Sequence, residues 1–224
     1  MEKQIEDKNT EMGNVITRSE EFIQKNQKTL TIAIVAVLVV VVAIFGLRRW
    51  YFQPREDRAA SEMFAAEQWF AQGEFQKALD GDDIFRGFTA VADSYKGTKA
   101  GNLARYYAGI CNLRLGNYDD AAHWLKKYNG KDTFTRPLAQ IALGDAEMEL
   151  GNTKSAVDNY MKAANMEQNF VTTPTALFKA GMGYIMLGDN GKALNCFNDI
   201  KHKYPESTEY SEIDKYIAIA EAGM

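Results

Sequence analysis

The chain has 224 residues, of which 46% are apolar and 25% are charged, with 26 basic and 30 acidic side chains and a net charge of −4. This composition excludes an intrinsically disordered chain, a collagen-like chain and a small disulfide-stapled domain. The acidic balance argues against non-specific binding to nucleic acid, because that binding requires a basic surface that displaces counterions from the phosphates. The length allows one globular domain and a further segment.

Residues 1–28 carry charges of both signs, and apolar residues such as Val15, Phe22 and Ile23 recur among them at helical spacings. We therefore predict a tail over residues 1–28 that is partly a short amphipathic helix. A solvated tail without regular structure is the alternative, because short helices are marginally stable on their own.

Residues 29–47 form an uninterrupted run of uncharged and mostly apolar side chains. As a helix the run would be about 28 Å long, which matches the hydrocarbon core of a bilayer. Arg48 and Arg49 follow it, and the aromatic residues 50–52 suit the membrane interface. We predict a transmembrane signal anchor over residues 29–52. It should be retained, because a cleaved signal peptide has a short basic start and small residues after its apolar region.

The basic residues on the two sides of this anchor, which indicate its orientation, are nearly equal in number. Three basic residues lie close before the apolar run and four lie close after it, namely Arg18, Lys25 and Lys28 against Arg48, Arg49, Arg55 and Arg58. Because basic residues are enriched on the cytoplasmic side, the count leans slightly toward a cytoplasmic carboxyl-terminal part.

The remainder of the chain, residues 53–224, shows helical periodicity and an internal repeat. Gly116, Gly151 and Gly188 each follow an apolar helical stretch and stand at nearly equal intervals along the chain. Pro137 and Pro174 precede the second and third of these glycines by the same interval. A period of about 35 residues is typical of two-helix arrays, in which glycine ends one helix and proline begins another.

The third repeat matches the tetratricopeptide pattern, since Gly181 is followed by Tyr184 and Ala193 by Phe197. We predict an all-α fold in which the single transmembrane helix precedes a tetratricopeptide-type solenoid of about four helix pairs and a capping helix. The predicted repeats lie near residues 59–97, 100–132, 137–170 and 174–206, and the capping helix covers residues 207–222.

Residues that could carry catalysis do not converge in the sequence. The two histidines, His123 and His202, lie far apart in the chain, and neither has a second histidine or a carboxylate at metal-ligand spacing. Phosphate-binding loops, dinucleotide fingerprints and nucleophile elbows are absent. We therefore predict a protein that is not an enzyme, with no catalytic, cofactor-binding or metal-binding residues.

The first helix of each pair is expected to line a concave surface, which is where helical solenoids bind their partners. The predicted protein-binding residues are Met63, Phe70, Tyr106, Ile110, Leu113, Arg114, Ile141, Asp145, Met148, Phe178, Met182 and Met186. These side chains are mainly apolar and rich in methionine, which suits a partner helix or an unfolded client. The alternative is that a carboxyl-terminal helix or the curl of the solenoid buries them.

Three segments complete the layout: Phe22–Lys28 before the anchor, Gly46–Tyr51 at its end, and Ala59–Phe70 at the start of the repeats. On the basis of these segments, nearly the whole chain resembles the YfgM-like ancillary subunits of the SecYEG translocon. The resemblance implies an association with the Sec translocon, with a membrane-anchored periplasmic chaperone or prolyl isomerase, and with translocating clients. The tail over residues 1–28 and the irregular segment Asp80–Gly97 depart from the simplest pattern of that family.

The resemblance further implies a single-pass protein of the bacterial inner membrane, with a cytoplasmic amino terminus and a periplasmic repeat domain. Long domains translocate largely regardless of flanking charge, so we follow the resemblance rather than the charge count. We expect a non-enzymatic scaffold that assists secreted or envelope proteins in the manner of a chaperone, without a small-molecule or nucleic-acid ligand. The alternatives are a scaffold for envelope assembly or cell division and a cytoplasm-facing, membrane-tethered adaptor.

Overall fold

The computed structural model describes residues 24–166 and 168–223, and every regular element in these residues is a helix. The chain divides into two compact units, one ending at Pro54 and the other beginning at Arg55. The amphipathic helix predicted for the tail falls mainly on residues 1–23 and so lies outside the described residues. The predicted all-helical fold is confirmed.

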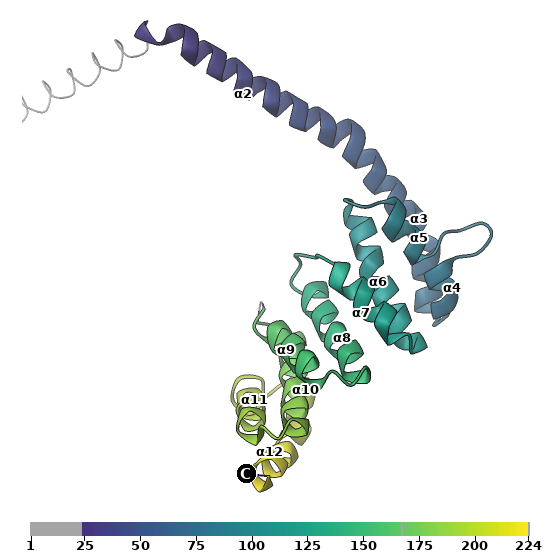
Figure 1. Ribbon diagram of the computed structural model, residues 1–224, viewed down its shortest axis with the longest axis vertical. Coiled ribbons are helices and arrows are strands. Elements are labelled where there is room, and N and C mark those ends of the chain that lie inside the picture. The colour runs from purple at the N-terminus through teal and green to yellow at the C-terminus, as the bar shows by residue number, and fades with distance from the viewer. Residues whose placement is uncertain (1–23, 167, 224) are drawn as a thin grey trace, which may run out of the picture. The chain divides into compact units, whose positions relative to one another are not determined.

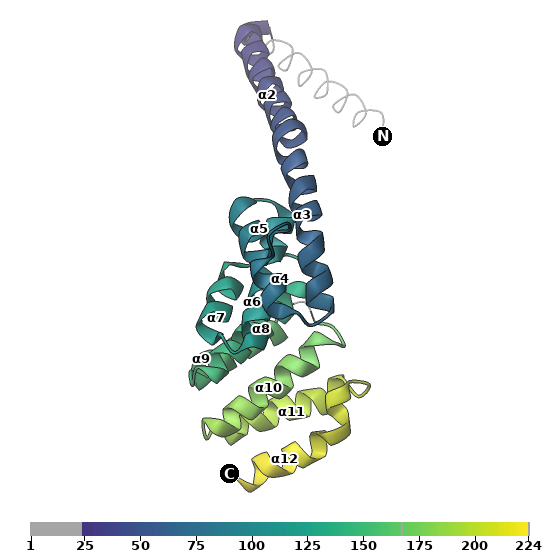
Figure 2. The ribbon, with the colours of Figure 1, turned by 90° about the vertical axis from the view of Figure 1, so that its right-hand side faces the viewer.

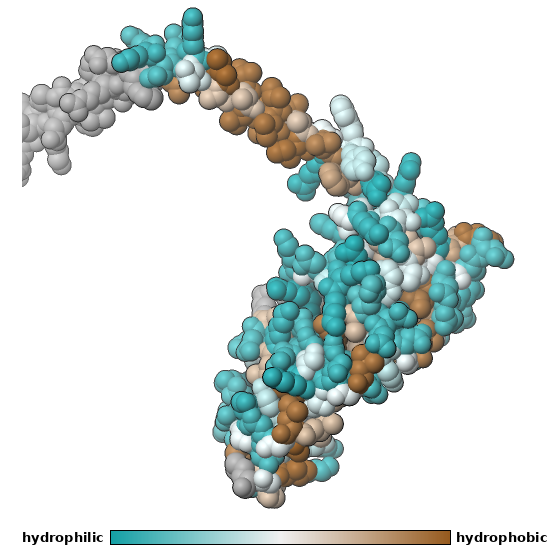
Figure 3. Space-filling model, in the orientation of Figure 1, coloured by the Kyte–Doolittle hydropathy of each residue, from teal (hydrophilic) through white to brown (hydrophobic). Residues whose placement is uncertain are grey.

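The apolar run forms helix α2, Gln27–Leu47, in the unit that ends at Pro54. Its side chains are not covered by protein; Val42, for example, is 69% exposed. Figure 3 shows α2 as a brown, apolar stretch, whereas the surface of the later helices is predominantly teal. Among the described residues, one helix is long and apolar enough to cross a membrane, and it contains this run.

Helix α2 continues through a π-helical turn, η1 (Arg48–Phe52), into α3 (Gln53–Ala71). In this turn the N–H of Gln53 donates to the carbonyl of Arg48, which lies one residue further back than in an ordinary α-helix. Pro54 explains the wide turn, because proline has no N–H to donate and its ring clashes with the preceding turn of an ordinary helix. The helix therefore passes the proline without ending.

The unit that begins at Arg55 is a solenoid of antiparallel helices (Figure 1). Its helices after α3 are α4 (Phe75–Asp80), α5 (Phe88–Ser94), α6 (Lys99–Leu115), α7 (Tyr118–Lys127), α8 (Thr135–Glu149), α9 (Thr153–Ala164), α10 (Thr172–Met186), α11 (Asn190–Lys203), the 3₁₀ turn η2 (Thr208–Glu212) and α12 (Ile213–Ala222). Figure 2 shows α10, α11 and α12 following one another at the carboxyl-terminal end of the solenoid. The pairs α6–α7, α8–α9 and α10–α11 are regular, while α3 to α5 form a less regular opening group.

The turn inside each pair has the same geometry. Gly116, Gly151 and Gly188 have φ of +80°, +79° and +75°, a conformation that favours glycine. After α10, for instance, the N–H of Gly188 donates to the carbonyl of Ile185, and the N–H of Asp189 donates to that of Tyr184, both at 2.9 Å. This double hydrogen bond satisfies carbonyls that the helix end would leave unpaired.

A second glycine in each regular pair lets its two helices approach closely. The glycines are Gly109, Gly144 and Gly181, and the side chains that lie over them are Leu125, Tyr160 and Phe197, each from the second helix of the same pair. A Cβ atom at Gly181 would come within 2.4 Å of the ring of Phe197. The small residue and the large one facing it therefore form one packing unit, which recurs from pair to pair.

Pro137 and Pro174 lie in the first turns of α8 and α10, where the missing proline N–H leaves no hydrogen bond unmade. The amides at the very start of these helices are capped from the preceding loops. Asp132 accepts from the N–H groups of Phe134 and Thr135, and Asn169 plays the same part before α10. Both helices thus begin at positions that the local sequence specifies.

The carboxyl-terminal helix α12 covers part of the preceding pair. Ile213 and Ala220 are 1% and 0% exposed. The ring of Tyr216 lies edge-on against that of Phe178 in α10, with centroids 4.7 Å apart. Helix α12 therefore covers the ring of Phe178 in α10.

A buried carboxylate joins the first two regular pairs. Glu147 in α8 is 5% exposed, and it accepts hydrogen bonds from the Lys126 ammonium at 2.7 Å and from the Asn152 side-chain amide at 2.9 Å. The bond from Lys126, followed by the one from Asn152, holds the pKa of Glu147 below its ordinary value of 4.5. The folded state therefore favours the charged carboxylate.

Replacing Glu147 with glutamine is expected to destabilise the chain by about 1–2 kcal/mol at pH 7, because a charge-assisted pair is lost. A lowered pKa contributes stability above the unfolded-state value, and this contribution disappears as the pH falls through the folded-state value. The difference between wild type and Glu147→Gln should therefore shrink below about pH 4.5. Urea unfolding at pH 7 and pH 3.5 measures this difference, and the exposed neighbour variant Glu149→Gln serves as the control. An equal loss at both pH values would contradict the prediction.

Candidate functional site

A pocket of about 420 Å³, lined by apolar and charged side chains, lies between successive first helices of the solenoid. Its lining residues come from α6, α8 and α10: Tyr106, Ile110, Leu113, Arg114, Leu138, Ile141, Ala142, Asp145 and Lys179. On α6 and α8 these residues recur at three- and four-residue spacings, so that each helix turns one face toward the pocket. We call this set the α6–α8 surface.

The floor of the α6–α8 surface is fixed by core packing. Ile141 is only 5% exposed, and Ile110 and Leu113 pack against the buried cluster formed by α7 and α8. Leu138 is 40% exposed at the pocket wall. The surface therefore offers apolar contact area on side chains that the fold already holds in place.

Polar groups stand at the edges of this surface. Asp145 accepts hydrogen bonds from the Tyr160 hydroxyl of α9 at 2.7 Å and from the Lys179 ammonium of α10 at 2.8 Å. Burial, together with the Asp145 charge, raises the pKa of Tyr160, so its hydroxyl remains a donor at neutral pH. These bonds tie three helices together beside the pocket, which limits how far its walls can move.

Six of the twelve predicted protein-binding residues meet in this pocket: Tyr106, Ile110, Leu113, Arg114, Ile141 and Asp145. The pocket also includes Leu138, Ala142 and Lys179, which were not among the predicted residues. Continuing the spacing of Ile141 and Asp145 one turn backward would have found Leu138.

The other six predicted residues lie elsewhere. Met63 is 4% exposed and belongs to the buried cluster of α3 to α6. Phe70 is partly buried and packs against this cluster, with Phe75, Phe88 and Tyr107 beside its ring. This placement corrects the groove assigned to them, because the opening helices bury that face of α3.

The same correction applies near the carboxyl-terminal end. Met148, Phe178 and Met182 pack against the buried cluster of α8 to α12, and α12 covers Phe178. Met186 is 65% exposed at the end of α10 but does not line the pocket. Helix α12 therefore covers Phe178, whereas Met186 on the same helix α10 remains exposed.

Within the ranges 24–166 and 168–223, no group of three or more histidine, cysteine, aspartate or glutamate side chains is placed to hold a metal ion. Cys111 and Cys196 are both buried and unpaired.

The model of the tetratricopeptide repeat family matches residues 175–207, which hold most of α10 and all of α11. The solenoid is of the tetratricopeptide type. In solved structures, the TPR-like repeats of a kinesin light chain from Podosopora anserina have this fold, with a TM-score of 0.56 at 14% identity, over 75% of this chain and 87% of that one. At this identity the likeness concerns the fold alone.

A TPR repeat-containing protein of Methanocaldococcus jannaschii is 30% identical over 116 residues, which make up 52% of this chain. The matched part spans 20% of the archaeal protein. Tetratricopeptide repeats point to a protein-binding scaffold, so the pocket between α6 and α8 is a candidate contact surface for a protein.

Proposed function

We propose that the chain is a non-enzymatic, membrane-anchored scaffold that binds apolar segments of other proteins on its α6–α8 surface. The observation that carries this proposal is the pocket of about 420 Å³, in which apolar side chains from two successive first helices meet. A pocket lined by Ile110, Leu138 and Ile141 removes apolar surface of a ligand from water, which is the main favourable term in association.

We further propose that the partners belong to the protein-secretion machinery. The supporting points are the exposed apolar helix α2, which suits a membrane anchor, and the resemblance of the whole layout to YfgM-like ancillary subunits of the Sec translocon. In this proposal α2 anchors the chain in the bacterial inner membrane, and the solenoid lies in the periplasm. There the α6–α8 surface contacts translocon components, a membrane-anchored chaperone or prolyl isomerase, and emerging clients.

Photo-crosslinking in cells tests the proposal. A photoreactive residue at Tyr106 or Leu138 should capture translocon subunits or secreted chains, identified by mass spectrometry. The matched control position is Asp158, which is exposed on α9, a second helix of a pair. Equal capture from Asp158 would contradict binding at the α6–α8 surface, and capture only of cell-wall or division proteins would overturn the secretion role.

A further inference from the structure

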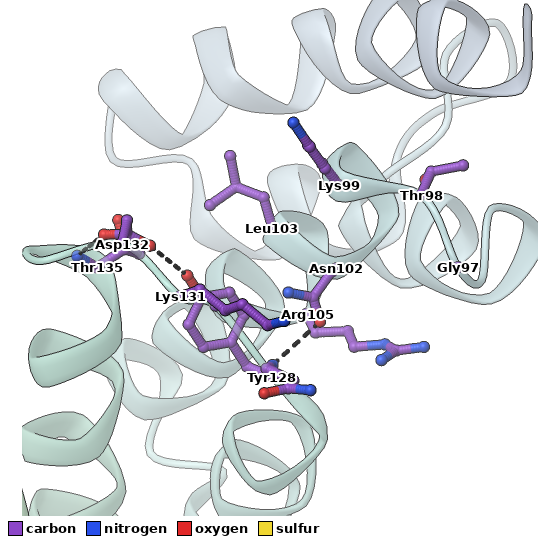
Figure 4. A pocket seen from close by; sticks show the side chains of 12 residues that line it. Gly97, Thr98, Lys99, Asn102, Leu103, Arg105, Tyr128, Lys131, Asp132 and Thr135 are labelled. Atoms are coloured by element: carbon purple, nitrogen blue, oxygen red, sulfur yellow. Dashed lines mark hydrogen bonds between the residues drawn. The ribbon is translucent and has the colours of Figure 1, made fainter. Parts of the chain in front are cut away.

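A second pocket, of about 850 Å³, opens beside the amino-terminal end of α6 (Figure 4). Figure 4 shows Lys99, Asn102 and Arg105 of α6 together with Tyr128, Lys131 and Asp132 from the connection between α7 and α8. The remaining lining residues are Gly97, Thr98, Leu103, Asn129, Gly130 and Thr135. We call this set the cationic pocket.

The cationic pocket has three basic side chains, Lys99, Arg105 and Lys131, and one acidic side chain, Asp132. Within the described part of the chain, neither lysine forms an ion pair with a carboxylate. This excess is local, because residues 59–224 carry 22 acidic and 17 basic side chains, a net charge of −5. The pocket is therefore a positive region on a negative domain.

The carboxylates at this end already have partners inside the protein. Both oxygens of Asp132 accept hydrogen bonds, from backbone N–H groups at the start of α8 and from the Tyr128 hydroxyl. Glu56 of α3 accepts from the N–H groups of Lys99 and Ala100, which satisfies these first amides of α6. The positive character thus comes from basic side chains rather than from free amides of the helix.

Hydrogen bonds hold the walls of the cationic pocket together. The N–H of Asn129 donates to the Asn102 side-chain oxygen at 3.1 Å. The Arg105 guanidinium donates to the carbonyl of Lys127, also at 3.1 Å. The end of α7 and the connection that follows it are therefore fastened to α6 at two points.

The cationic pocket adjoins the α6–α8 surface. The ring of Tyr128 in the former lies 5.6 Å, centroid to centroid, from the ring of Tyr106 in the latter. Along α6, Leu103, Tyr106 and Ile110 follow at spacings of three and four residues, so they occupy one face. A ligand lying along this face would contact the basic side chains of the cationic pocket at one end. At the other end it would contact the apolar side chains of the α6–α8 surface, whose edges carry Arg114 and the paired Asp145 and Lys179.

We propose that the two pockets form one bipartite site, which selects apolar polypeptide segments with acidic residues at one end. This inference rests on the proposed function, because it assumes that the α6–α8 surface holds the apolar part of the segment. The occupant follows from charge complementarity: Lys99, Arg105 and Lys131 favour carboxylates and disfavour a basic flank. Tyr106 and Tyr128 would lie under the junction between the two parts of the ligand.

The test measures peptide binding to the full chain in nanodiscs of zwitterionic lipid, by fluorescence anisotropy, with empty nanodiscs as the background. Each peptide has a core of leucine and alanine and a flank of three identical residues, which are glutamates, glutamines or lysines. Each flank is tested once at the amino-terminal end of the core and once at the carboxyl-terminal end. The glutamate-flanked peptide should bind about tenfold more tightly than the glutamine-flanked one at low salt, and the lysine-flanked peptide most weakly. The preference should diminish as the ionic strength rises.

Charge reversal at the basic side chains provides the matched variants. Lys99→Glu with Lys131→Glu should remove the preference for the glutamate flank and favour the lysine flank. The control carries the same change in net charge at two exposed lysines outside both pockets, Lys154→Glu with Lys215→Glu, and should keep the wild-type preference.

The outcomes separate this inference from the proposed function. If all three peptides bind equally, and Leu138→Glu abolishes their binding, the bipartite site is wrong while the apolar surface stands. If none of the peptides binds, the proposed function fails. If glutamate-rich peptides without the apolar core, or vesicles of anionic lipid, bind as tightly as the full peptide, the cationic pocket is an anion site in its own right and the bipartite site is overturned.

Discussion

Alanine in place of Gly181 is expected to destabilise the solenoid by about 1–3 kcal/mol. The added Cβ would lie 2.4 Å from Cε1 and 2.7 Å from Cζ of Phe197. That ring is fully buried, and Phe178 and Tyr216 lie beside it, so it has little room to move away. Thermal or urea unfolding of the full chain, followed by circular dichroism, measures the loss.

Gly191→Ala is the matched control for Gly181→Ala. Gly191 also lies in a helix, α11, but a Cβ there would meet no atom within 4 Å. Because alanine is the better helix former, this variant should be neutral or more stable by up to about 1 kcal/mol. Equal effects of the two variants would show that helix propensity, rather than the contact with Phe197, decides the outcome.

Three arginines in α2 are expected to remove the chain from the membrane and to block export of its carboxyl-terminal part. The variant combines Val37→Arg, Leu38→Arg and Val41→Arg, three side chains that are more than half exposed on α2. Each arginine near the centre of a membrane helix costs about 2.5–3.5 kcal/mol, so together they offset the favourable transfer of the apolar run.

A periplasm-active phosphatase fused after Met224 reports the result. The wild-type fusion should be active and should remain with the membrane after alkaline extraction, whereas the arginine variant should be inactive and extractable. The control variant, Val37→Leu with Val41→Leu, keeps the segment apolar and should behave as the wild type. An inactive wild-type fusion would overturn the periplasmic placement of the solenoid and support the cytoplasm-facing adaptor.

Much of the fold could be predicted because its signals are local. The turn after each first helix needs a left-handed residue, so Gly116, Gly151 and Gly188 mark the helix ends directly in the sequence. Pro137 and Pro174 mark the starts of α8 and α10, because the first turn of a helix does not need the N–H that proline lacks. Helix α5 and the loop before it break the period, and no local signal there specifies how they pack.

The candidate site could be predicted only in part. Helical spacing identifies an apolar face, but it does not show which later element covers that face. Tyr216 covers Phe178 from α12, which follows only after the whole of α11. The cationic pocket was missed because Lys99 and Lys131 come from a helix start and from a loop far from it in sequence, and the solenoid brings them together.

The length of α6 sets a limit on the segment that can lie along both pockets at once. With Phe178 under Tyr216 and Phe70 packed against the opening cluster, the two pockets are lined mainly by α6 (Lys99–Leu115), α8 and the connection before α8. A helix of this length extends about 25 Å. A segment bound along it would contain about seven residues if extended, or about 17 if helical. The scaffold would therefore read a short stretch of its partner at a time, and longer clients would have to pass over it in successive pieces.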